Sequence, residues 1–190
     1  MLNRQFSSTI KKVFIGFSVF LFGTGSSILA TKSFASPGFF EHQWDPEPGY
    51  KRLKYYQSSS KRNERSTYYF FLRGNDRKED IKKLTIAIPD YFEARIKTKK
   101  LNLCKVKVGG YTERTRCLEN IPSLIEVNDK QTFIDIFPEK PIPFNKNNYA
   151  VVMKIFNPRK RGMFQFRALS QNADEIPIST YLGTWNVDVQ

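Results

Sequence analysis

The stretch YAVVMKIF at residues 149–156 gives the first indication of the fold. Apolar side chains occupy both of its alternating faces, and only Lys154 interrupts them. A strand that is apolar on both faces is typical of the interior of a sheet, because neither of its faces meets water. The stretch therefore predicts a central strand of a β-sheet domain.

A second apolar stretch, MFQFRAL at residues 163–169, follows after the turn NPRKRG. Its apolar side chains alternate with Gln165 and Arg167, which predicts a strand with one face on the core and one in solvent. Pro158 cannot donate a backbone hydrogen bond, and Gly162 tolerates a positive φ. We therefore expect the two strands to form a hairpin.

The rest of residues 67–190 consists of further short alternating segments separated by Pro, Gly and Asn. Asp76 can cap one short helical turn in the charged stretch before residue 84. Many short strands without a sustained 3.6-residue period predict an all-β domain, an antiparallel β-sandwich of the immunoglobulin-like type. We expect its other strands at residues 67–72, 84–88, 101–108, 124–127, 132–137 and 181–189.

The chain is strongly basic. Its 190 residues include 31 Lys and Arg against 18 Asp and Glu. Four of the basic residues and none of the acidic ones precede Ser36, so the rest of the chain has 27 against 18 and a formal charge of +9. Such a charge favours anionic partners such as polysaccharide, phospholipid surfaces, nucleic acid or acidic protein. A solvated basic surface that only keeps the domain soluble is the alternative.

Residues 1–35 have the layout of a secretory signal peptide. A short basic start precedes the apolar run VFIGFSVFLF at residues 13–22, and small residues precede Ala35. Cleavage after Ala35, or after Ala30 as a second choice, predicts an exported protein of the periplasm or cell surface that meets the membrane only before cleavage. An uncleaved anchor over residues 13–30 is the alternative, although its Gly and Ser content weakens it as a permanent helix.

Residues 36–66 form a basic lead-in that contains Pro and Ser and has no sustained apolar stripe. Phe39, Phe40 and Trp44 can pin its start onto the domain. Equally, the lead-in can stay mobile until something binds it. We therefore expect the folded domain to begin at residue 67.

Cys104 and Cys117 are the only cysteines, and an even number in an exported protein indicates a disulfide. If residues 109–112 form a four-residue hairpin loop, Val108 pairs with Glu113 and Cys104 lies opposite Cys117. A metal site would need further Cys or His ligands, and a redox pair would have the C-x-x-C spacing. The sequence therefore favours a structural disulfide.

The sequence has no nucleophile elbow, zinc-binding HExxH, phosphate-binding loop or dinucleotide motif. His42 is the only histidine and is interpreted as a surface residue. Asp76, Glu79 and Asp80 are interleaved with Lys and Arg, which indicates a solvated surface rather than an acid/base pair or a calcium site. The sequence thus predicts a protein that is not an enzyme and has no catalytic residues, metal or cofactor.

Positive charge clusters in two places, beside aromatic residues. One cluster is Arg159, Lys160 and Arg161 in the NPRKRG turn, and the other includes Lys61 and Arg62 in the lead-in. Basic groups attract anions, and exposed aromatic rings stack on sugars, so we expect an anionic polysaccharide or an envelope protein as partner. Export argues against nucleic acid.

The signal peptide, LTIAIP at residues 84–89 and the Asn-Pro turn ahead of residues 163–169 occur together with YLGTW at residues 181–185. In combination they resemble the exported cyanobacterial family known as domain of unknown function 2808. The resemblance covers about residues 67–189 and implies a periplasmic or envelope protein with an all-β domain. It supplies no catalytic residues, and the basic lead-in lies outside it.

The sequence thus predicts a non-catalytic, disulfide-bridged envelope protein that binds an anionic glycan. An extracytoplasmic hydrolase is one alternative, and a structural subunit that lends an edge strand to an envelope assembly is another. Salt-sensitive binding to polyanions would favour the first function, turnover of esters or glycosides the second, and concentration-dependent self-association the third.

Overall fold

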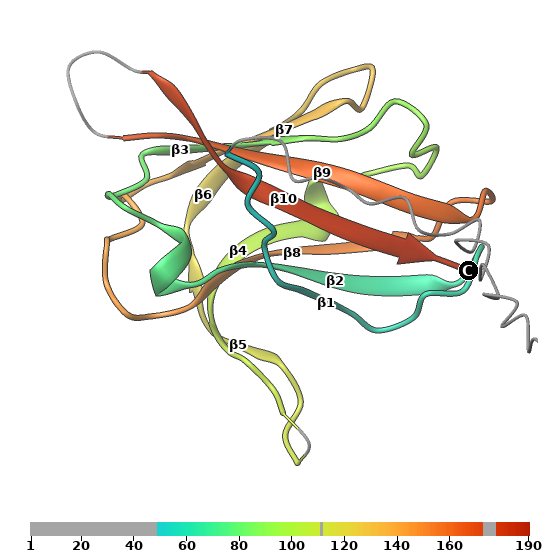
Figure 1. The fold of residues 1–190 in the computed structure, drawn as a ribbon, viewed down its shortest axis with the longest axis horizontal. Coiled ribbons are helices and arrows are strands. Elements are labelled where there is room, and N and C mark those ends of the chain that lie inside the picture. The colour runs from blue at the N-terminus through green and yellow to red at the C-terminus, as the bar shows by residue number, and fades with distance from the viewer. Residues whose placement is uncertain (1–48, 111, 173–177) are drawn as a thin grey trace, which may run out of the picture. The chain divides into compact units, whose positions relative to one another are not determined.

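The structure is a computed structural model that describes residues 49–110, 112–172 and 178–190. Two antiparallel sheets of five strands pack face to face in this part of the chain (Figure 1). The first sheet has the order β1 (Tyr55–Gln57), β2 (Arg65–Leu72), β8 (Tyr149–Phe156), β4 (Leu101–Lys107), β5 (Arg116–Ile121). The second has the order β10 (Ser179–Val189), β9 (Gly162–Gln171), β3 (Lys83–Ala87), β7 (Phe133–Pro138), β6 (Ser123–Val127). Two 3-10 turns, η1 (Gly74–Asp76) and η2 (Thr98–Lys100), complete these elements. The predicted immunoglobulin-like β-sandwich is confirmed.

Several sequence-based expectations lie outside the described residues. They concern the signal peptide, the aromatic residues Phe39, Phe40 and Trp44, and His42. Within the described ranges, no helix is both long and apolar enough to cross a bilayer.

The core lies between the sheets and is built from side chains at every second strand position. Phe70 of β2 joins the two layers, because its ring centroid lies 5.1 Å from that of Phe166 and 4.9 Å from that of Trp185. The other face of β8 is also covered, since Ala150 and Val152 pack in a smaller buried cluster. β8 lies between β2 and β4, so the prediction of a central strand is confirmed. Its core-facing side chains are Tyr149, Val151, Met153 and Ile155, and those of β9 are Phe164, Phe166 and Ala168.

The predicted hairpin across the NPRKRG turn is wrong. β8 pairs with β2 and β4 in one sheet, whereas β9 pairs with β3 and β10 in the other. The turn therefore carries the chain from one layer to the other. Asn157 contributes to this course, because its buried side chain donates to the loop that precedes β2. Alternation within each strand is the same for a hairpin and for a connection between sheets, so the sequence could not distinguish them.

The sandwich begins before the predicted boundary at residue 67. β1 pairs with β2, and ahead of it Leu53 is buried in the core. The Leu53 N–H donates to the Thr184 carbonyl at 2.8 Å, and the Thr184 N–H donates to the Lys51 carbonyl at 2.8 Å. Gly183 permits this close crossing, because its φ is +149° and a Cβ there would lie 2.6 Å from the Lys51 oxygen. Single buried residues such as Leu53 anchor the segment before β2 to the core. The segment therefore needs no continuous apolar stripe, and its sequence shows none.

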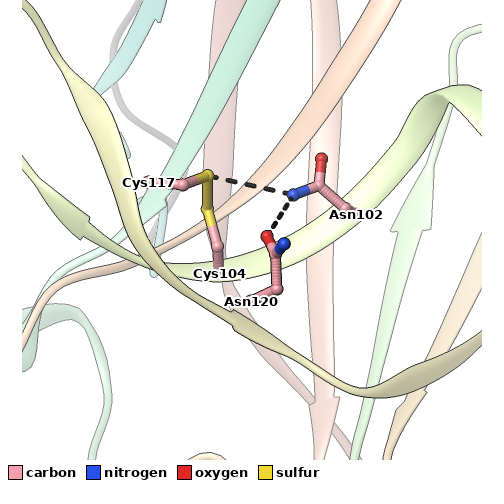
Figure 2. The surroundings of a disulfide bond; sticks show 4 residues. All are labelled: Asn102, Cys104, Cys117 and Asn120. Carbon is pink, nitrogen blue, oxygen red and sulfur yellow. Dashed lines mark hydrogen bonds between the residues drawn. A yellow bond between two sulfur atoms is a disulfide. The ribbon is translucent and has the colours of Figure 1, made fainter.

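The predicted disulfide joins Cys104 on β4 to Cys117 on β5 (Figure 2). The predicted register is wrong, because Cys117 lies opposite Val106, and Cys104 lies opposite Asn120. The bridge therefore forms on a diagonal, with the two Cα atoms 5.7 Å apart. Beside it, the side chain of Asn102 donates to Asn120 Oδ1 at 3.1 Å (Figure 2).

A longer hairpin loop accounts for the changed register. β4 ends at Lys107 and β5 begins at Arg116, so the loop is longer than the expected residues 109–112. The Gly109 N–H donates to Thr115 Oγ1 at 3.0 Å and closes the loop near its base. A bulge at Leu118 then shifts the pairing by one residue, and this side chain is exposed.

Candidate functional site

The two basic clusters predicted from sequence meet at one end of the sandwich. One lies in the loop between β1 and β2, and the other lies in the connection between β8 and β9. The neighbouring ends of β2 and β8 bring these segments together, because Arg65 pairs with Phe156. We call this region the basic end, which comprises Lys61, Arg62, Arg159, Lys160 and Arg161.

Asn157 holds the two clusters against each other. Its backbone N–H donates to the Glu64 carbonyl at 2.8 Å. Its side-chain Nδ2 donates to the carbonyls of Ser59 at 3.0 Å and Lys61 at 2.7 Å. Its Oδ1 accepts a hydrogen bond from the Tyr68 hydroxyl. One buried amide thus connects both basic loops and the core.

The Tyr68 hydroxyl is suited to this donor role. Burial raises its pKa above the usual value, and the neighbouring Tyr55 raises it further. The phenol therefore remains protonated and keeps its hydrogen for Asn157. The loop between β1 and β2 is held from a second side by Gln190, the residue after β10, since its N–H donates to the Ser60 carbonyl at 2.7 Å. These bonds fix the backbone from which the cations project.

Two cations of the basic end form exposed ion pairs. Lys160 Nζ lies 2.6 Å from Glu93 Oε1, and Lys61 Nζ lies 3.7 Å from Glu64 Oε1. Exposed pairs of this kind contribute about 0–1 kcal/mol each, so an anionic ligand can displace them at low cost. The three arginines of the basic end have no ion-pair partner within the described residues.

A third basic segment, RIKTKK at residues 95–100, flanks the basic end. Leu101 pairs with Met153, which places η2 beside the final part of β8. The Glu93–Lys160 pair links the start of the segment to the β8–β9 connection. Sequence reasoning missed this contribution, although four cations within six residues between two predicted strands are a visible signal.

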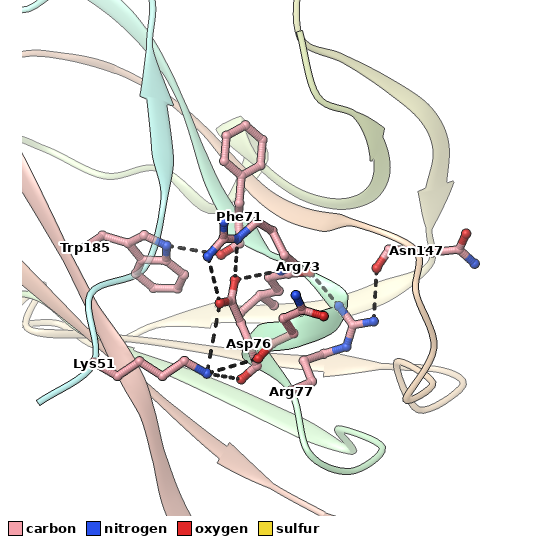
Figure 3. Close-up of polar contacts among 9 residues, drawn as sticks. Lys51, Phe71, Arg73, Asp76, Arg77, Asn147 and Trp185 are labelled. Atoms are coloured by element: carbon pink, nitrogen blue, oxygen red, sulfur yellow. Dashed lines mark hydrogen bonds and ion pairs between the residues drawn. The ribbon is translucent and has the colours of Figure 1, made fainter. Parts of the chain in front are cut away.

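A buried charged network lies at the opposite end of β2 and β8 (Figure 3). The Asp76 carboxylate accepts from the Arg73 backbone N–H at 3.0 Å and from its guanidinium at 3.0 and 3.1 Å. Lys51 Nζ lies 4.0 Å from the same carboxylate. The interpretation of this cluster as solvated surface is wrong for Asp76, because the acid is buried and bonds back to the residue before η1. Glu79 and Asp80 are exposed.

Arg77 is also buried rather than solvated. Its guanidinium donates to the carbonyls of Asn145 at 2.9 Å and Asn147 at 3.1 Å, and Figure 3 shows the bond to Asn147. The guanidinium also stacks on the Tyr149 ring, 4.8 Å from the ring centroid. Burial lowers the pKa of Arg77 below its usual range. Its Nη1 also donates to the Leu72 carbonyl, so the guanidinium crosslinks the loop before β8 to the end of β2. Four of its five hydrogen bonds go to backbone carbonyls, which is the arrangement of a structural crosslink.

No group of three His, Cys, Asp or Glu in residues 49–110, 112–172 and 178–190 could hold a metal ion.

Residues 39–189 match the sequence model of a family described as protein of unknown function (DUF2808). The match extends into the lead-in, well before the expected start at residue 67. No curated protein matches the chain.

Several solved structures resemble the chain at low identity. The collagen-binding domain from a Staphylococcus aureus adhesin is 14% identical, with 72% of this chain and 96% of that chain covered and a TM-score of 0.40. BslA, a bacterial hydrophobin, is 11% identical, with 73% and 91% covered and a TM-score of 0.44. The collagen-binding subdomain of the Enterococcus faecalis surface protein ACE is 10% identical, with 73% and 97% covered and a TM-score of 0.43. These likenesses assign no function to the chain.

Proposed function

Since the chain belongs to the family of proteins of unknown function DUF2808, we propose a function from its own residues: it is a non-catalytic, exported envelope protein whose basic end binds acidic polysaccharide. One observation supports this above all. The Asn157 amide joins two basic loops that lie 96 to 98 residues apart in the chain. Two clusters that are unremarkable alone thereby become one concentrated positive surface.

The electrostatics of the basic end favour a polyanion. Its three unpaired arginines offer planar guanidinium groups, which match carboxylate and sulfate oxygens with two parallel hydrogen bonds. The basic segment at residues 95–100 extends the surface, so that a polymer can contact several cations at once. The chain after the signal peptide has a formal charge of +9. This charge favours encounter with anionic polymers over neutral ones.

Export and a non-catalytic role are supported by observations away from the basic end. The signal-peptide pattern of residues 1–35 indicates secretion. The Cys104–Cys117 bridge is consistent with an oxidising compartment such as the periplasm or the cell surface. The buried carboxylate of Asp76 is engaged by Arg73 and Lys51, as expected for a structural group rather than an acid/base catalyst.

The test is binding of the mature protein to polygalacturonate, which is acidic, and to dextran, which is neutral, across a salt series. Only polygalacturonate should bind. Its affinity should fall steeply with salt, since the Debye length shrinks from about 10 Å at 0.1 M to about 3 Å at 1 M. The double variant Arg159→Glu and Arg161→Glu should lower the affinity at least about tenfold, given about 1 kcal/mol per cation at an anionic surface.

The matched control is Arg114→Glu with Arg116→Glu. It makes the same charge change on the exposed β4–β5 hairpin, which extends from the opposite end of the sandwich. This control should retain most of the affinity. If both double variants lost polygalacturonate affinity equally, the effect would come from the net charge of the protein and not from the basic end. Equal binding of both polymers would refute the proposal, and turnover of ester or glycoside substrates would identify a hydrolase instead.

A further inference from the structure

A depression of about 970 Å³ lies on the outer face of the second sheet, apart from the residues of the basic end. Its floor includes Ala87 of β3 with Gln165 and Arg167 of β9. These residues alternate with core-facing neighbours, so their side chains point to solvent. Four aromatic residues line the same depression: Tyr50, Tyr91, Phe133 and Tyr181. We call it the aromatic groove.

The tyrosines of the aromatic groove are held in place by hydrogen bonds. Asn186 Nδ2 donates to the Tyr50 hydroxyl at 2.8 Å, and the Tyr181 hydroxyl shares a 2.7 Å bond with the Thr184 hydroxyl. The Tyr91 hydroxyl donates to a backbone carbonyl of β9 at 3.5 Å. Rings that are already ordered lose little freedom when a ligand stacks on them, which favours binding. Half of the Tyr91 surface, 52%, nevertheless remains exposed.

Arg167 is a cation that forms no ion pair with a described residue in the aromatic groove, although Asp90 also lines it. Its neighbours across the two adjacent strands are Ala87 and Thr184, which carry no charge. The described residues provide no hydrogen-bond or ion-pair partner for its guanidinium. On the same sheet face, by contrast, Lys83 Nζ lies 3.2 Å from an Asp135 carboxylate oxygen. The guanidinium of Arg167 is therefore available to a ligand anion.

The aromatic groove and the basic end lie along the same strand. Arg161 immediately precedes β9, and Arg167 follows six residues later. At about 3.3 Å per residue, the two positions are roughly 20 Å apart along the strand. Tyr91 bonds to the first part of β9, and Glu93 pairs with Lys160 of the basic end. A linear polymer lying along β9 can therefore reach both.

A pyranose ring with a carboxylate combines the two features that the aromatic groove offers. Its C–H-rich face can pack on an aromatic ring, and its carboxylate can accept two parallel bonds from a guanidinium. We propose that the aromatic groove binds a hexuronate unit of the acidic polymer, with the carboxylate on Arg167 and the ring against Tyr91. This inference rests on the proposed function for its polyanionic ligand. The basic end supplies attraction for any polyanion, and the groove selects for sugar.

The experiment compares two soluble probes by isothermal titration calorimetry with the mature protein. One is a galacturonate octamer, and the other is a glutamate octapeptide, which has the same number of side-chain or ring carboxylates but no sugar. Arg167→Gln should lower galacturonate affinity about tenfold or more, because a charge-assisted bidentate contact is lost. Glutamate affinity should change by less than about twofold, as for an exposed charge away from the contact. Tyr91→Leu should likewise lower the affinity for the galacturonate octamer and leave the affinity for the glutamate octapeptide nearly unchanged.

Arg116→Gln is the matched control and should affect neither probe, since it removes one exposed cation from the distant hairpin. Arg167→Lys, which keeps the charge, should give an intermediate galacturonate affinity. The groove is refuted if Arg167→Gln leaves galacturonate binding unchanged while Arg159→Glu with Arg161→Glu weakens both probes. If instead the basic-end variant changes nothing and Arg167→Gln weakens galacturonate alone, the proposed role of the basic end fails and the groove stands. Absence of galacturonate binding by the wild type would refute both.

Discussion

Replacing Asn157 by Ala should separate the two loops of the basic end without changing the net charge of the protein. The Asn157 side chain is 3% exposed and makes three side-chain hydrogen bonds: two that it donates to loop carbonyls and one that it accepts from Tyr68. The substitution removes all three at once and leaves the cations of both loops in place.

The expected loss of stability follows from the surroundings of each bond. A typical intramolecular hydrogen bond contributes about 1 kcal/mol net, so three give about 3 kcal/mol. The two loop carbonyls lie near the surface, where water can replace the amide. The Tyr68 hydroxyl is fully buried, so losing its acceptor costs about 1–3 kcal/mol. The smaller loss from the two loop bonds and the loss at Tyr68 together lower the free energy of unfolding by about 2–4 kcal/mol. This corresponds to a decrease in Tm of roughly 6–12 °C for a chain of this size.

Urea unfolding followed by tryptophan fluorescence measures this loss, because Trp185 is fully buried in the core. Tyr68→Phe removes the other partner of the buried bond. In the double variant with Asn157→Ala, the two losses should fall short of additive by about 1 kcal/mol. Asn120→Ala, at an exposed asparagine of β5, serves as the control and should cost no more than about 0.5 kcal/mol.

The binding assay provides a second readout. If Asn157 positions the loops, folded Asn157→Ala protein should bind polygalacturonate more weakly than wild type, although every cation remains. A destabilisation below about 0.5 kcal/mol, or full additivity with Tyr68→Phe, would refute the role assigned to the amide.

Three further predictions concern the fold and its export. Gly183→Ala should destabilise the domain by about 1–3 kcal/mol in urea titrations, because the new Cβ would lie 2.6 Å from the Lys51 carbonyl oxygen; an unchanged midpoint would contradict the crossing described here. Replacing Cys104 and Cys117 together by Ala should cost about 3 kcal/mol by the same measurement, since the bridge closes a loop with a sequence separation of 13; peptide mapping that finds two free thiols in the native protein would show that no bridge forms. Sequencing of the native N-terminus should find Ser36, and an intact residue 1 in a membrane fraction would show that the apolar segment is kept as an anchor.

Local sequence patterns predicted the strands of the sandwich well. The two-faced apolar pattern of residues 149–156 identified β8, and the alternation ending at Val189 placed Trp185 on the core face of β10. The cysteine count predicted the bridge between β4 and β5. These features follow from periodicity and composition, which each segment has before it meets the rest of the chain.

The candidate site was predictable only in parts. The sequence showed both basic clusters, and RIKTKK at residues 95–100 was equally visible, but nothing local indicated that they share one end of the molecule. The aromatic groove is still less apparent in the sequence. Tyr50, Tyr91 and Tyr181 come from three segments far apart in the chain. Only the pairing of β9 with β3 and β10, together with the crossing of residues 51–53 at β10, assembles them around Arg167.

Short-range alternation and residue chemistry were sufficient to predict eight of the ten strands that the structure describes, the core faces of β8, β9 and β10, and the bridging cysteines, but not β1 or β5. Which sheet each strand joins, in contrast, follows only from the packing of the whole chain. The chain crosses from β8 to β9 between layers, and residues 51–53 cross β10 where Gly183 leaves room. Both depend on contacts between residues about a hundred or more positions apart, such as those of Asn157. Such contacts form only when the layers pack, so no local pattern encodes them.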